Sequence, residues 1–246
     1  MVYVFGSQVI YYQHIPGKEN AAPLILLHGN GEDHHIFDTL CDSLGEDFDI
    51  YAPDSRGHGL SACPEELHYQ DMADDLYRFI TELDIRKPLI VGFSDGGITA
   101  LIFASTYSHL CSGIICCGAN TCPKGLTGQE RMAIKKAMKR KLSSHGSSDT
   151  DIDTVSSQVF AASGALERLM LTEPDISEKM LGQISVPVLV LSGENDLVKK
   201  SDTMKIFSSI QKSQLRILPG EDHGSYVIGS DRLSSFIRDF WAIFTD

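Results

Sequence analysis

The stretch that decides the fold is Leu89-Ile90-Val91-Gly92-Phe93-Ser94-Asp95-Gly96-Gly97. It joins an apolar run to a helical pattern through a G-x-S-x-G sequence, which places Ser94 in a sharp strand-to-helix turn. Glycines are needed at 92 and 96 because side chains there would clash with the crowded backbone. The free N–H groups of the following helix point toward charge that develops near Ser94. This context favours a functional serine over an incidental one in a glycine-rich loop.

Apolar runs and helical patterns alternate on both sides of this stretch. The runs are rich in Ile, Leu and Val and do not alternate with polar residues, as in strands covered on both faces; they are 24–27, 48–52, 88–92, 113–117, 186–191 and 215–218. Residues 71–83, 97–107 and 233–244 have helical spacing. Residues 2–5 and 9–13 indicate a hairpin at the sheet edge. The alternation predicts an α/β fold with a mostly parallel sheet and helices on both faces.

The alternation of strands and helices stops between residues 119 and 185, where no strand is expected. Residues 131–142 and 154–171 have helical patterns joined by a polar loop at 143–153. We therefore expect a helical cap at 119–185, inserted into a core formed by 1–118 and 186–246. The run 131–141 has six basic residues and no acid. It forms either a solvated helix face, with Ile134, Ala137 and Met138 turned inward, or a face for anionic substrates or a membrane surface.

Composition limits the function classes. The 246 residues are 42% hydrophobic, which is enough for a substantial core and argues against disorder. The formal net charge of −12 argues against nucleic acid as a partner, because phosphate binding needs clustered Lys and Arg. This charge is unevenly placed: residues 119–185 have a net charge of +1 and the remainder −13.

The start of the chain and its cysteines bear on the compartment. The first residues lack a basic region, a continuous apolar stretch and a small-residue cleavage site, and no apolar stretch approaches ~18 residues. We expect the six cysteines to be reduced and structural. The sequence thus predicts a cytoplasmic protein with no stable membrane insertion.

A serine nucleophile needs a base and an acid that orients the base. His223 follows the run 215–218, although a single loop histidine is often only solvated. Asp196 follows the run 186–191; its alternative role is to cap a helix that starts near Lys199, and Glu194 is the competing acid. We expect Ser94, Asp196 and His223 to form a catalytic triad, in the chain order known for α/β-hydrolases.

An oxyanion hole requires two backbone N–H donors. We expect one from Asp95, directly after the serine, and one from Asn30, which lies between Gly29 and Gly31 in the loop after strand 24–27. His28 is expected to support this loop by packing and hydrogen bonding. The Asp95 side chain either bonds backbone at the turn or contacts a cationic group of the substrate.

With these residues assembled, the sequence resembles the α/β-hydrolase fold superfamily along nearly its whole length, as a small member similar to serine esterases and lipases. The resemblance rests on the motif order: His28–Gly31, the D-x-R-G-x-G-x-S loop at 54–61, the Ser94 turn, 193–196 and His223. It implies an eight-stranded sheet, a cap after strand six, no cofactor and hydrolysis of esters, amides or thioesters. Relatives with an aspartate nucleophile do not fit, because Ser94 holds that position. Asn120 stands where some relatives carry the acid, which favours Asp196.

These observations predict an enzyme that cleaves a small carboxylic ester through an acyl-enzyme on Ser94, as a monomer or homodimer without a metal or other cofactor. An acyltransferase or a cofactor-free perhydrolase of the haloperoxidase type is an alternative on the same triad. A hydrolase-fold protein that only binds its ligand is another.

Overall fold

The computed structural model describes residues 1–5, 8–144 and 163–243 of the chain. Within them, eight strands form one sheet in the order β1-β2-β4-β3-β5-β6-β7-β8. The pairs β1–β2 and β2–β4 are antiparallel, and the strands from β4 to β8 are parallel. The strands are β1 (Val2–Phe5), β2 (Gln8–Ile15), β3 (Ala22–Leu27), β4 (Phe48–Pro53), β5 (Leu89–Phe93), β6 (Gly113–Cys117), β7 (Val188–Gly193) and β8 (Ser213–Leu218). The mostly parallel eight-stranded sheet expected from the sequence is confirmed.

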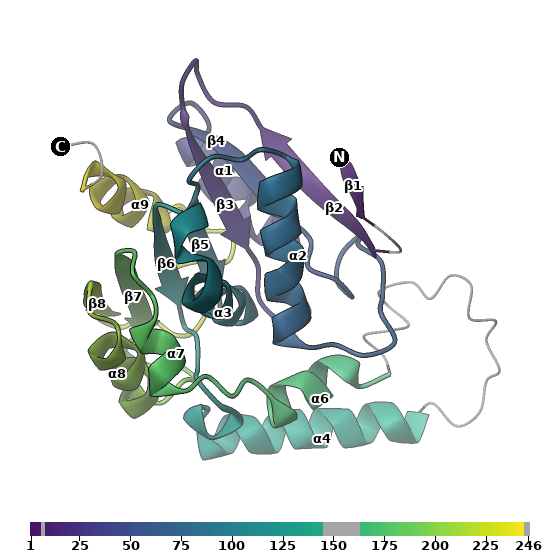
Figure 1. Ribbon diagram of the computed structural model, residues 1–246. Helices are drawn as coiled ribbons and strands as arrows, with labels where there is room; N and C mark the ends of the chain where they lie inside the picture. The colour runs from purple at the N-terminus through teal and green to yellow at the C-terminus, as the bar shows by residue number, and fades with distance from the viewer. Residues whose placement is uncertain (6–7, 145–162, 244–246) are drawn as a thin grey trace.

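Helices cover both faces of the sheet (Figure 1). In that view α2 and α3 lie in front of the sheet, and α1 and α9 lie behind it. The helices are α1 (Asp38–Leu44), α2 (Tyr69–Glu82), α3 (Asp95–Tyr107), α4 (Gly128–Ser144), α6 (Ala165–Thr172), α7 (Glu178–Gly182), α8 (Lys200–Ser209) and α9 (Leu233–Ala242), with short 3-10 turns η1 (His34–Phe37), η2 (Ser108–Leu110) and η3 (Pro123–Gly125).

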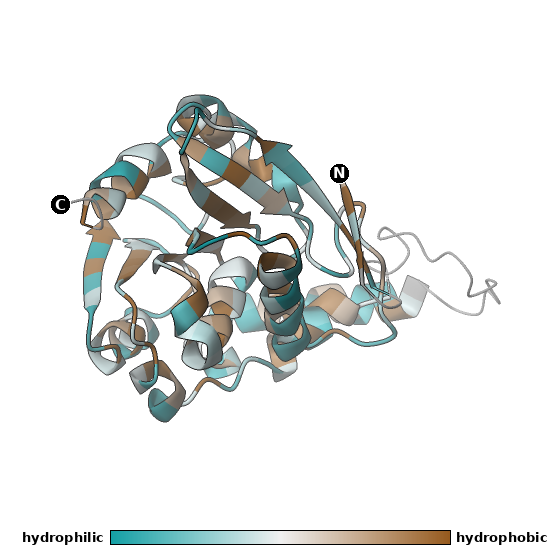
Figure 2. Ribbon diagram, turned by 45° about the horizontal axis from the view of Figure 1, so that its top comes forward, coloured by the Kyte–Doolittle hydropathy of each residue, from teal (hydrophilic) through white to brown (hydrophobic). Residues whose placement is uncertain are grey.

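The apolar central strands β3, β5, β6 and β7 explain this layering. Along β3, Leu24 and Leu26 pack into the cluster that holds the buried side chains of α1 and α9, whereas Ile25 and Leu27 pack into the cluster with α2 and α3. Successive strand residues point to opposite faces, so a run without polar residues needs a helical layer on each side. Figure 2 shows the corresponding brown, hydrophobic colour in the central strands. The expectation of a strand covered on both faces is wrong for β8, where Gln214 and Arg216 are exposed because β8 is the edge of the sheet.

The segment between β6 and β7 contains α4, α6 and α7 and no strand among the residues described. Figure 1 shows α4 and α6 side by side below the sheet, and α7 packs against α3 and α8. The helix expected at 154–171 overlaps α6, while residues 154–162 and most of the loop expected at 143–153 lie outside the described residues. The division into a core and a separate cap at 119–185 stays a prediction.

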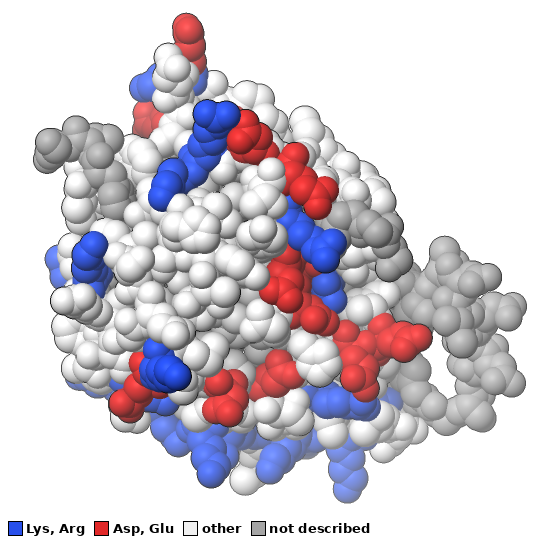
Figure 3. Space-filling view, in the orientation of Figure 1, with Lys and Arg blue, Asp and Glu red and all other residues white. Residues whose placement is uncertain are grey.

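Helix α4 carries the basic run. Ile134 is buried, Ala137 and Met138 are half-buried, and Lys136 and Lys139 are exposed, as expected for a solvated helix face. Figure 3 shows Lys and Arg gathered along the lower edge of the molecule, over α4, and Asp and Glu above them. Among the helices described, none combines the length and the apolar character that a membrane span requires.

Candidate active site

Ser94 stands at the turn between β5 and α3 with φ 50° and ψ −112°. This is the left-handed region, which costs free energy for a non-glycine residue and is held only by its surroundings. The Ser94 N–H donates to the Cys117 carbonyl at 2.8 Å, which fixes the turn to β6. A Cβ on Gly92 would lie 2.3 Å from the Gly96 carbonyl oxygen, and one on Gly96 would lie 2.1 Å from that of Leu27. The glycines on either side of Ser94 are therefore required by close backbone approach.

The structure brings Ser94, His223 and Asp196 together from three loops. The Ser94 Oγ lies 3.0 Å from His223 Nε2, and His223 Nδ1 lies 2.6 Å from Asp196 Oδ1. A carboxylate only accepts hydrogen bonds, so the proton belongs on Nδ1 and Nε2 is free to accept the serine proton. A chain of two hydrogen bonds thus leads from the serine hydroxyl to a carboxylate.

Asp196 is held by backbone and side-chain donors besides His223. Its Oδ1 accepts the Val198 N–H at 2.9 Å, and its Oδ2 accepts the Ser192 hydroxyl at 3.0 Å. Burial alone would raise the pKa of this carboxyl, but the hydrogen bond and charge of His223 with these donors lower it below its usual value. Glu194, the competing acid, accepts the Gly220 N–H at 2.9 Å and has no contact with His223 among the hydrogen bonds described.

The loop after β3 is fixed through His28. The Ser55 N–H donates to His28 Nε2 at 2.9 Å, so Nδ1 carries the proton and donates to the Gly29 carbonyl at 2.8 Å. Burial lowers the pKa of His28 to about 3, so the ring stays neutral at ordinary pH. The Asn30 N–H shares a trans peptide with the Gly29 carbonyl and points the opposite way. Among the described residues, no group accepts a hydrogen bond from the N–H of Asn30 or Asp95.

Asp95 joins three elements beside the serine. Its Oδ2 accepts the Asn30 side-chain amide at 2.8 Å, and its Oδ1 accepts the Tyr69 hydroxyl at 2.7 Å. Burial raises the pKa of Asp95, and these two donors act in the opposite direction. The carboxylate therefore ties the loop after β3 and the start of α2 to α3. Contact of Asp95 with a substrate stays a prediction.

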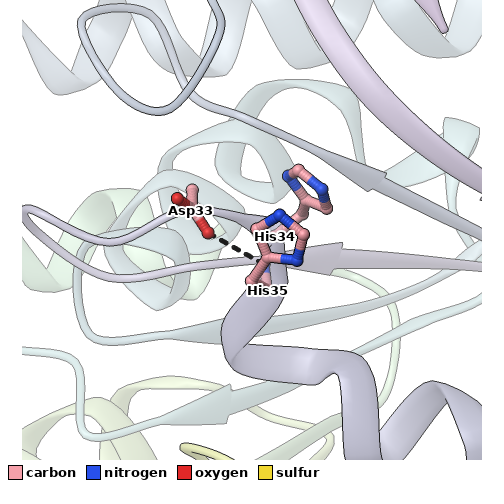
Figure 4. A group of neighbouring side chains, drawn as sticks. All are labelled: Asp33, His34 and His35. Atoms are coloured by element: carbon pink, nitrogen blue, oxygen red, sulfur yellow. Dashed lines mark hydrogen bonds between the residues drawn. The ribbon is translucent and has the colours of Figure 1, made fainter.

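One group of adjacent side chains among the described residues has potential metal-binding atoms within 4.8 Å of one another: Asp33, His34 and His35 (Figure 4). Each is already held by the protein. Asp33 accepts the His35 N–H at 2.9 Å, the His34 ring bonds Asp54 at 2.7 Å, and the His35 ring bonds Asp38 at 3.1 Å. Three consecutive residues, with the His35 side chain 66% exposed, do not form the closed four-ligand cage of a structural zinc site. Their contacts are those of a capped 3-10 turn anchored on Asp54.

Comparison with known proteins agrees with the fold. The sequence model of a family described as alpha/beta hydrolase fold matches residues 22–140, which include the loop after β3 and the Ser94 turn. The chain has the α/β-hydrolase fold. A serine hydrolase, BPHL, of Mus musculus is 26% identical to this hydrolase over 94% of the chain and 82% of the relative.

Two further relatives cover almost the full length. A putative esterase/lipase of Haemophilus influenzae is 22% identical over 97% of the chain and 90% of its own length. The solved structure of a thermophilic esterase from Thermogutta terrifontis has a TM-score of 0.74 and 22% identity, covering 96% of this hydrolase and 93% of the esterase. At such identity, the structural likeness shows the fold.

Sequence reasoning missed Glu32, Tyr69 and Gly118 in the site. Gly118 has φ +60° and leaves room for the His223 ring, since a Cβ there would lie 2.9 Å from its Cε1. Its position directly after the run 113–117 was the one available signal, because strand ends meet at the same edge of a parallel sheet. Tyr69 opens a helix whose spacing marks it as core, and Glu32 lies in a polar loop, so nothing in the sequence distinguished them.

Proposed function

We propose that this hydrolase cleaves a small carboxylic ester through a covalent acyl-enzyme on Ser94. The observation that supports it is the hydrogen-bond chain from Ser94 Oγ to His223 Nε2, at 3.0 Å, and from His223 Nδ1 to Asp196 Oδ1, at 2.6 Å. The named relatives that the sequence matches, a serine hydrolase and a putative esterase/lipase, support a hydrolase that acts on ester bonds.

In the first half of the reaction, His223 Nε2 takes the hydroxyl proton while Ser94 Oγ attacks the ester carbonyl carbon. The carbonyl oxygen becomes an oxyanion and accepts hydrogen bonds from the N–H groups of Asn30 and Asp95. Asp196 stabilises the imidazolium that forms. The tetrahedral intermediate collapses when His223 gives its proton to the leaving alcohol, which leaves the acyl group on Ser94.

In the second half, water replaces the alcohol. The water oxygen attacks the acyl carbon while His223 takes a proton from the water. The second tetrahedral intermediate then expels Ser94 Oγ, which recovers the proton from His223. The product is a carboxylic acid. The same chemistry with an alcohol or peroxide in place of water describes an acyltransferase or perhydrolase, so product analysis with these acceptors separates the three activities.

A fluorophosphonate probe tests the proposal directly, because it labels only an activated serine. Wild-type protein should be labelled and should hydrolyse p-nitrophenyl esters of short acyl chains, while Ser94→Ala should lose both properties. Ser208→Ala, on the exposed face of α8, is a matched control that should keep both. Failure of the wild type to react with the probe would favour a protein that only binds its ligand; retained esterase activity in Ser94→Ala would refute Ser94 as the nucleophile.

A further inference from the structure

Glu32 places a carboxylate beside the nucleophile. Its Oε2 accepts the Gly29 N–H at 2.9 Å. A Cβ built on Gly29 would lie 2.7 Å from that oxygen and 3.2 Å from the Ser94 Cβ, so the Glu32 carboxylate and the Ser94 side chain both lie against the same position of Gly29. The side chain is half-buried, and its Oε1 accepts no hydrogen bond from any residue described.

The charges around Glu32 leave this carboxylate uncompensated. The side chains that act on it most strongly through charge are His223, Asp95 and Asp33, which are one histidine and two acids. His223 is engaged with Asp196 at 2.6 Å, and Asp95 is bonded to neutral donors only. None of the three is a permanent cation, so the electrostatic potential near the nucleophile is negative whenever Glu32 is ionised.

Arg56, in the loop after β4, does not compensate the charge of Glu32. Arg56 donates to Asp75 through Nε and Nη2, both at 2.6 Å, and to Asp71 through Nη1 at 2.9 Å. Two carboxylates therefore balance one guanidinium. The region outside 119–185 carries a net charge of −13, which also favours a negative potential near the nucleophile.

We propose that Glu32 selects substrates by charge, favouring esters with a cationic group on the acyl chain and disfavouring esters with an anionic group there. The physical cause is Coulomb attraction or repulsion in a partly desolvated site, where charges interact more strongly than in water. The inference rests on the proposed esterase function and adds the substrate class.

The selection is expected to depend on pH. Burial, together with the charges of Asp95 and Asp33, raises the pKa of Glu32 to about 7, and the Gly29 N–H and His223 limit this rise. Glu32 is thus mostly neutral at pH 6 and mostly ionised at pH 8. The preference for cationic over anionic esters should grow across this interval.

The test compares three p-nitrophenyl esters of equal chain length: hexanoate, 6-(trimethylammonio)hexanoate and the monoester of adipate. Neither charged group of these substrates titrates between pH 6 and 8. At pH 8, the wild-type ratio of kcat/KM for the cationic to the anionic ester should exceed that of Glu32→Gln by about tenfold or more. Gln keeps an oxygen for the Gly29 N–H, and hexanoate turnover reports whether the site is intact.

Glu178→Gln is the matched control, because it removes the same charge from the exposed start of α7. It should leave the ratio unchanged. Equal ratios in wild type and Glu32→Gln at pH 8 would overturn the proposal, as would a wild-type ratio that is flat from pH 6 to 8. The pH dependence of the wild-type ratio tests the proposal even if Glu32→Gln does not fold. Absence of turnover of all three esters by the wild type would instead count against the esterase function.

Discussion

The imidazole of His28 holds the carbonyl oxygen of Gly29 at 2.8 Å, and this contact fixes the peptide that carries the Asn30 N–H. Because the N–H and C=O of a trans peptide point in opposite directions, holding the oxygen toward His28 directs the hydrogen away from it. The Ser55 N–H fixes the tautomer that makes this possible. We therefore expect this buried, neutral histidine to act on the proposed reaction through the backbone of its neighbour.

Replacing His28 by alanine should therefore lower kcat and leave KM nearly unchanged. Loss of one oxyanion donor typically costs ~10²–10³ in rate, and the expected loss is about 10² because the peptide keeps some of its orientation. Steady-state kinetics with a p-nitrophenyl ester provide the measurement, and a thermal unfolding curve checks the fold. His109→Ala, an exposed histidine, is the control. A kcat within threefold of wild type would show that His28 does not position the donor.

Asp196→Asn should lower kcat by about 10⁴, because an amide disfavours the histidine tautomer with its proton on Nδ1. Glu194→Gln should change kcat little, since Glu194 contacts the Gly220 N–H rather than His223. Both variants remove one negative charge from the same loop, so the pair separates the hydrogen bond from the general electrostatic effect. Comparable losses in the two variants would contradict the assignment of Asp196.

The sheet and the triad candidates were predictable because both depend on local patterns. Continuous apolar runs indicate strands buried on both faces, and residues that directly follow parallel strands meet at one edge. Ser94, Asp196 and His223 each follow such a run, so their approach needed no knowledge of side-chain packing. The stretch 34–44 was missed, because η1 and α1 are short and rich in polar residues.

The contacts that tune the site were not predictable in this way. Tyr69 reaches Asp95 across 26 positions, and only the packing of α2 on α3 brings the two together. The same sequence pattern fits a tyrosine that is merely part of the core. Glu32 stands in a loop whose charge would ordinarily be solvated, and its burial beside Gly29 follows from how the loop closes over Ser94.

Glu32 should also make stability depend on pH. Burial raises the pKa of its folded form to about 7, above the value of an exposed carboxyl, so the folded state binds more protons than the unfolded state between these values. Ionisation of Glu32 then weakens the fold as pH rises from about 5 to 7. Glu32→Gln removes this penalty and should be more stable than wild type at pH 8, with a smaller difference at pH 5. Thermal unfolding at both pH values measures it, and an equal difference at the two would exclude Glu32 as the cause.

The backbone behind Ser94 leaves no room for a side chain at position 96. A Cβ on Gly96 would lie 2.1 Å from the Leu27 carbonyl oxygen, so Gly96→Ala must displace β3 or α3. Such overpacking typically costs ~1–3 kcal/mol, and more here because the obstacle is backbone in the centre of the sheet. Gly128→Ala adds the same methyl group at the start of α4, where nothing lies within 4 Å, and should be neutral or slightly stabilising. Urea unfolding of both variants gives the comparison. If Gly96→Ala were as stable and as active as Gly128→Ala, the turn would have space for a methyl group. The close backbone contacts would then not be the reason for a glycine at position 96.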